Sequence, residues 1–181
     1  MIMKKLCFTL TLCLGLAPIA APAFATTNDN IWIRQIGSEG FDQGNGISID
    51  KDGSVLVVGS FSGRAAFDKR TVLNSAGKKD IFIAKYDSNG TFLWAKQYGG
   101  PGNDRALKSS IDAEGNIIVT GSIGPGGVSF GKHNLFASGF SDIFVAKFKP
   151  DGSPEWARNF GGTGVDEGTA VAVDSDGNYL V

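Results

Sequence analysis

Three aspartates recur at intervals of 62 residues, each at the end of a glycine-rich segment, and they are the side chains best placed to bind an ion. They are Asp42, Asp104 and Asp166. Ca²⁺ prefers carboxylate and carbonyl oxygens, so a ring of these side chains could bind calcium with help from the backbone. Alternatively, each aspartate accepts hydrogen bonds from amides of its own connection, where glycine supplies the unusual backbone angles. The sequence favours this structural alternative, because every repeat needs such a connection whatever the protein binds.

Residues 126–132 approach a phosphate-binding P-loop without completing it. The sequence is Gly-Gly-Val-Ser-Phe-Gly-Lys, but His133 follows where a Ser or Thr would meet the magnesium ion, and no helix is predicted after it. His133 is the only histidine, and both cysteines, Cys7 and Cys13, lie in the N-terminal segment. A Ser-His-Asp triad would depend on this one loop histidine without a supporting nucleophile motif. We therefore expect no catalytic residue, no enzyme activity and no resident cofactor, with calcium as the one ion to consider.

A second series of aspartates begins short Asp-Gly turns. These are Asp50, Asp112 and Asp174. The tetrapeptides that they begin resemble calcium loops, but they lack the further ligands and the distant glutamate of an EF-hand. Because Asp side chains close tight turns and Gly accepts positive φ, these segments are predicted to be hairpin turns.

Each 62-residue unit is predicted to contain two hairpins and therefore four antiparallel strands. In the first unit, the hairpins span residues 46–59 and 80–96. Apolar residues follow one another at 55–58, 81–84 and 143–146, and successive side chains of a strand point to opposite faces. Both faces of these strands therefore require burial. Four-stranded sheets packed against others of the same kind are the blades of a β-propeller, so the predicted fold class is all-β.

The three tryptophans share the 62-residue spacing. They are Trp32, Trp94 and Trp156. Their common place at strand ends favours packing between blades over stacking on a sugar. Gly99 and Gly161 begin the glycine-rich connections and are assigned structural roles as well.

The first 25 residues have the pattern of a Sec-type signal peptide. Lys4 and Lys5 precede an apolar run at residues 6–20, and Ala-Phe-Ala at 23–25 fits a signal-peptidase site. The apolar run is shorter than the ~20 residues that a membrane-spanning helix needs. We expect cleavage after residue 25, a secreted, periplasmic or cell-surface location, and no membrane span in the mature chain.

Residues 26–181 have the composition of a turn-rich β protein. Glycine is abundant, at 26 residues, and the charged residues are scattered. Removal of Lys4 and Lys5 lowers the formal net charge from −1 to −3, which argues against nucleic acid or anionic lipid as a partner. No cysteine remains to form a disulfide, so the core alone must hold the fold.

Several of these segments resemble the bacterial β-propeller repeat called SBBP. In the first unit they are residues 59–61, 80–87, 94–96 and 99–104; in the second they are 121–123, 142–148, 156–158 and 161–166. The resemblance covers nearly all of the mature chain. It implies a propeller in an exported bacterial protein, and it carries over no catalytic residue.

The repeat predicts about two and a half blades in the partial propeller of residues 26–181. Its parts are a strand with Trp32, blades at 46–98 and 108–160, and the start of a third blade at 169–181. Closed propellers have 4–8 blades. We therefore expect a fragment of a longer protein, whose further blades complete the ring, or a chain that associates with itself.

The strand order predicts two different faces. The Asp-Gly turns lie on one face, and the long connections at residues 62–79 and 124–141 lie on the other, which varies most between the two copies. Long loops on a rigid scaffold commonly bind ligands. The predicted function is a non-catalytic scaffold or recognition module of an exported protein, with a protein or carbohydrate partner on the long-loop face. In the alternative, residues 84–94 belong to a tryptophan-docking motif of a quinoprotein dehydrogenase, which they resemble.

Overall fold

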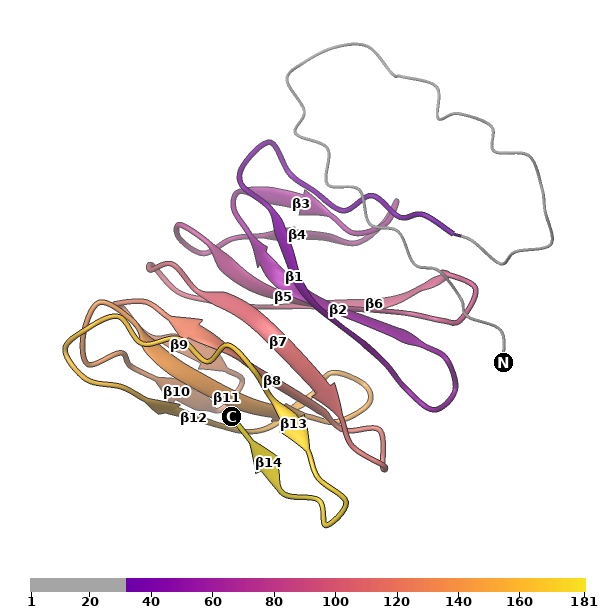
Figure 1. Cartoon of the computed structure of the whole chain (residues 1–181). Helices are drawn as coiled ribbons and strands as arrows, with labels where there is room; N and C mark the ends of the chain where they lie inside the picture. The colour runs from indigo at the N-terminus through magenta and orange to yellow at the C-terminus, as the bar shows by residue number, and fades with distance from the viewer. Residues whose placement is uncertain (1–31) are drawn as a thin grey trace.

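The computed structural model of the chain describes residues 32–181, and all regular structure in this range is β-strand. The predicted signal peptide, residues 1–25, lies outside the described residues. Two four-stranded antiparallel sheets pack face to face (Figure 1). The predicted all-β fold built from propeller blades is confirmed.

The two blades have the same strand order. Blade 1 consists of β1 (Gln43–Ile49), β2 (Val55–Phe61), β5 (Asp80–Tyr86) and β6 (Phe92–Tyr98), paired in that order. Blade 2 consists of β7 (Arg105–Ile111), β8 (Ile117–Ile123), β11 (Asp142–Phe148) and β12 (Pro154–Phe160). The first strand of each blade begins three residues before the predicted start, because β1 and β7 each contain an irregular register that extends the pairing.

Each long connection contains a small two-stranded sheet that the sequence analysis did not predict. In blade 1 it is formed by β3 (Arg64–Ala66) and β4 (Val72–Asn74), and in blade 2 by β9 (Val128–Phe130) and β10 (His133–Leu135). Each carries a buried aromatic ring onto its blade. Phe67 packs against Phe61 and Phe82, and Phe130 packs against Tyr98, Phe144 and Phe148.

The main core lies between the two blades. Leu56, Val58, Ile81 and Ile83 of blade 1 join blade 2 side chains such as Phe144 in one buried cluster. The opposite face of blade 1 contributes to a second cluster, which includes Val55, Val57, Phe82, Ala84 and Tyr86. Adjacent residues of one strand therefore belong to different cores, as expected when both faces of a sheet are buried.

The innermost strands lie side by side. β7 contacts β1 on one side and β13 (Ala172–Val173) on the other, and β13 pairs with β14 (Tyr179–Leu180) (Figure 1). The structure assigns residues 32–36 to no strand, although a fourth strand was predicted at Trp32. A strand requires a hydrogen-bonded neighbour, and within residues 32–181 this segment is followed only by an isolated bridge between Gly37 and Ala66.

Gly121 allows the first two strands of blade 2 to approach each other at the irregularity. A Cβ at this position would overlap the carbonyl oxygen of Arg105 on the paired strand. We expect Gly121→Ala to lower the free energy of unfolding by about 1–3 kcal/mol, measured by urea denaturation, because the backbone would have to shift. Gly164→Ala is the control, since a Cβ there meets nothing within 4 Å. Equal stability of the two variants would contradict this role.

Candidate functional site

The hairpin turns lie at one end of the sheets, and their aspartates serve the turns themselves. The Oδ1 atom of Asp50 accepts hydrogen bonds from the amides of Asp52 and Ser54, at 3.0 and 2.8 Å. Its Oδ2 atom lies 3.0 Å from Nζ of Lys85 on the third strand. Burial raises the pKa of Asp50, but the hydrogen bonds from Lys85 and the turn amides outweigh it, so the pKa is lowered.

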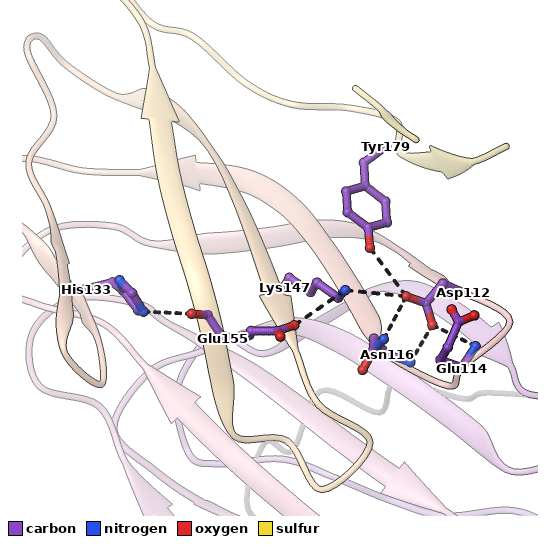
Figure 2. A network of polar contacts seen from close by, with 7 residues as sticks. All are labelled: Asp112, Glu114, Asn116, His133, Lys147, Glu155 and Tyr179. Atoms are coloured by element: carbon purple, nitrogen blue, oxygen red, sulfur yellow. Dashed lines mark hydrogen bonds and ion pairs between the residues drawn. The ribbon is translucent and has the colours of Figure 1, made fainter. Parts of the chain in front are cut away.

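The same arrangement recurs in blade 2 and extends into the next hairpin. Asp112 accepts amide hydrogen bonds from Glu114 and Asn116, and its Oδ2 atom lies 3.8 Å from Nζ of Lys147. Figure 2 shows that the Tyr179 hydroxyl reaches this carboxylate, at 3.4 Å. Asp174 also accepts turn amides, from Asp176 and Asn178. All carboxylates of this series therefore bind protein groups.

The Asp50–Lys85 pair offers a test of stability against pH. We expect Lys85→Met to lower the free energy of unfolding at pH 7 by about 1–3 kcal/mol, because Asp50 keeps its charge without its partner. The lowered pKa of Asp50 gives stability that is present above its unfolded pKa and lost as the pH falls below it. Denaturation at pH 7 and pH 3 should therefore show a smaller acid loss in the variant. Lys51→Met, at an exposed position of the same turn, should behave like the unchanged protein.

The tryptophan of one blade lies on a turn of the next. Trp94 in β6 packs against Gly152, where a Cβ would lie 3.0 Å from the indole ring. Gly152 has a φ of 78°, which glycine adopts without strain. The Tyr98 hydroxyl donates a hydrogen bond to the Gly152 carbonyl oxygen, at 3.0 Å. The corresponding contact in blade 1 is Trp32 with Gly90, whereas Trp156 packs against Tyr179 of the last hairpin.

The aspartates of the glycine-rich connections bind backbone amides. Asp104 is fully buried and accepts hydrogen bonds from the amides of Gly100 and Gly124, at 2.9 and 2.8 Å. Asp42 accepts from the Ser38 amide at 2.6 Å, and Asp166 accepts from the Gly162 amide at 2.9 Å. Burial raises the pKa of Asp104 to about 6, although the two amides lower it in part.

Gly99 and Gly161 allow close packing around a second pair of buried carboxylates. A Cβ at Gly99 would overlap Asp80, and a Cβ at Gly161 would lie 2.6 Å from Asp142. Asp80 accepts a hydrogen bond from the Ala76 amide in the long connection, while its Oδ1 atom is buried without a partner among the described residues. These aspartates tie the long connection to the start of the third strand.

A cavity of about 300 Å³ opens at the end of blade 2 that carries the long and glycine-rich connections. Its walls include Pro101 and Asn103 from one glycine-rich connection and Arg105 just after it, with Val165 and Glu167 at the corresponding place in the next unit. Phe140, from the long connection of blade 2, completes the rim. Isolated parallel bridges join Lys79 to Asn103 and Ser141 to Val165, so the backbone of the walls is fixed.

The cavity is lined by positions that differ between repeats. Pro101, Asn103 and Arg105 alternate with Gly102 and Asp104, which are buried. In the neighbouring repeats, Arg105 corresponds to a glutamine and to a glutamate, whereas Asp104 is aspartate each time. The sequence analysis selected the constant aspartates and missed the variable residues beside them. This difference between copies was the signal that could have identified them.

The P-loop-like segment forms a hairpin. Val128–Phe130 is strand β9, Gly131 and Lys132 form its turn, and β10 follows. His133 lies 2.9 Å, through Nε2, from the backbone oxygen of Glu155 on β12 (Figure 2). Its ring therefore links the hairpin to the outer strand. Across residues 32–181, no group of three or more His, Cys, Asp or Glu side chains is arranged to hold a metal ion, and no helix could span a membrane.

Four-stranded antiparallel sheets, stacked face to face with their first strands side by side, define a β-propeller repeat protein. Residues 31–60 match the family model SBBP, described as a beta-propeller repeat. This chain therefore carries an SBBP repeat, and the resemblance found in its motifs is confirmed.

Two relatives match larger parts of the chain. The regulatory protein FlaEY of Caulobacter vibrioides is 33% identical over 136 residues, covering 72% of this chain and 14% of FlaEY. The uncharacterized WD repeat-containing protein L264 of Acanthamoeba polyphaga mimivirus is 28% identical over 127 residues, covering 56% of this chain and 9% of that protein. The chain thus spans a small part of the length of these relatives.

Proposed function

We propose that this chain is a non-catalytic recognition module of an exported bacterial protein, which binds its partner on the long-loop face. One observation carries the proposal: the cavity on this face is lined by positions that vary between repeats. The constant glycines and aspartates beside them hold the backbone. A rigid scaffold with variable residues on its connections is the usual arrangement of a binding site.

The polar side chains that were candidates for chemistry make hydrogen bonds that stabilise the fold. Asp104 binds two amides, Asp112 closes a turn, and His133 contacts the backbone of β12. Trp94, in the segment that resembles a quinoprotein motif, packs on the turn of blade 2. These contacts support a scaffold in preference to a propeller enzyme.

The proposal is tested by applying the purified chain to peptide and glycan arrays. We expect a set of bound sequences or sugars, with at least tenfold weaker binding by Phe140→Ser on the cavity rim. Phe140 is 75% exposed, so the substitution leaves the core intact. Ile49→Ser, beside the turns and 62% exposed, is the matched control and should bind normally. Equal loss in both variants, or no bound ligand, would refute recognition by the long-loop face.

A further inference from the structure

Arg105 lies in the wall of the cavity, and its side chain has no hydrogen-bonding partner among residues 32–181. It is the first residue of β7, paired with Ser122 of β8, and it follows the buried Asp104. Its Nε atom is buried and has no partner among the described residues. The guanidinium also makes no hydrogen bond within 3.5 Å to any of residues 32–181. Its side chain is 38% exposed, so the remaining donors are open to water or to a ligand.

Within the described residues, the carboxylate paired with Arg105 makes no hydrogen bond to it. The Oε1 atom of Glu167 lies 3.8 Å from Nη1 of Arg105, and both side chains are 38% exposed. An ion pair of this length and exposure is weak and readily exchanged. Lys78 also lines the cavity. The ionisable side chains of the lining are therefore Lys78, Arg105 and Glu167, and together they carry a net positive charge. The cavity is therefore complementary to an anion.

The cavity also has apolar residues at its rim. Phe140 and Val165 line the cavity, and they are 75% and 69% exposed. Large side chains that remain so exposed beside a cavity offer a surface to the apolar part of a ligand. The lining thus combines an unsatisfied guanidinium with an aromatic and an aliphatic surface.

We propose that this cavity binds a carboxylate that carries an adjacent apolar group, with the carboxylate on Arg105 in exchange for Glu167 and the apolar group on Phe140 and Val165. A guanidinium can bind both oxygens of a carboxylate through two parallel hydrogen bonds, which a neutral amide cannot reproduce. The carboxylate belongs to a free apolar acid or to the C-terminus of a peptide. This proposal rests on the recognition function proposed above.

The test is a titration of the isotope-labelled chain, followed by NMR at the backbone amides and at the Arg105 Nε–H group. The probes are N-acetylphenylalanine, its amide, and a tripeptide that ends in phenylalanine. We expect the acid to bind at least tenfold more tightly than the amide, with shifts centred on Arg105. Comparable binding of the tripeptide assigns the site to a peptide C-terminus, and binding of the single acid alone assigns it to a free acid.

Variants separate the contributions. Arg105→Gln should weaken binding of the acid at least tenfold and remain folded, because Gln43 occupies the same repeat position. Glu167→Gln should strengthen binding of the acid, and Lys51→Gln, on the turn face, should leave that binding unchanged. Failure of the acid to bind, or equal affinity in Arg105→Gln, would overturn the proposal. An amide that binds as well as the acid, and loses affinity in Phe140→Ser, would overturn the anion assignment and leave recognition by this face intact.

Discussion

Replacement of Phe130 by alanine is expected to lower the free energy of unfolding by about 3–5 kcal/mol, the largest effect of any single substitution considered. Phe130 is fully buried although it belongs to a long connection. Its ring lies 5.1 Å from that of Tyr98 in blade 1 and 5.2 Å from that of Phe144 in blade 2, measured between centroids. Its removal therefore opens a cavity in the core that joins the blades.

Urea denaturation of the whole chain measures this effect. Phe136→Ala is the matched control: it lies in the same connection and is 67% exposed, so we expect a change of less than about 1 kcal/mol. If the two variants were equally stable, Phe130 would not anchor the connection, and the small sheet β9–β10 would not contribute to the stability of the core.

The second large effect is expected for Asp104→Ala. Its carboxylate accepts the amides of Gly100 and Gly124, and both hydrogen bonds are buried. Each amide left without an acceptor costs about 1–2 kcal/mol, so the free energy of unfolding should fall by about 2–4 kcal/mol. Asp166→Ala removes the corresponding carboxylate from an exposed connection, where water can replace it, and should cost less than about 1 kcal/mol.

Asp104 also gives a dependence on pH of definite sign. Burial raises its pKa to about 6, and the nearby charge of Asp80 contributes to the rise. Between the unfolded pKa and this value, the folded chain binds more protons than the unfolded chain, so stability falls as the pH rises. Acidification from pH 7 to pH 5 should therefore raise the free energy of unfolding by on the order of 1 kcal/mol. An identical pH dependence in Asp104→Ala would show that the signal comes from another group.

The blades could be predicted from the sequence because their pattern is local and repeated. Apolar residues on consecutive positions required burial of both faces, and Asp-Gly turns marked the hairpins. The start of β1 was predicted too late, since Gly44 and Asn45 have the composition of a loop. Gly44 pairs with Gly59, and the register shifts at Asn45, before Gly46 pairs with Val58. The small sheets were missed because strands of three residues between turns, such as β9, carry too little periodicity.

The cavity could not be predicted from the sequence, because it is formed by segments that are distant along the chain. Arg105 and Glu167 are 62 residues apart, and their side chains meet only because successive connections lie next to each other. The sequence offered Asp104 as a candidate ion ligand but favoured a structural role, and its oxygens accept hydrogen bonds from backbone amides. The functional candidates are the neighbours that alternate with it in an extended segment.

The contact of Trp32 and of Trp94 with a glycine turn of the following blade has a consequence for how such chains evolve. Trp94 meets Gly152 and Trp32 meets Gly90, so the interface is the same at successive junctions. A duplication or deletion of one whole unit leaves each remaining tryptophan facing the glycine turn of the following blade. An insertion of another length within these strands would move the tryptophan away from that glycine. Recombination can therefore alter the number of blades without a new interface, while residues such as Arg105 diverge in each copy.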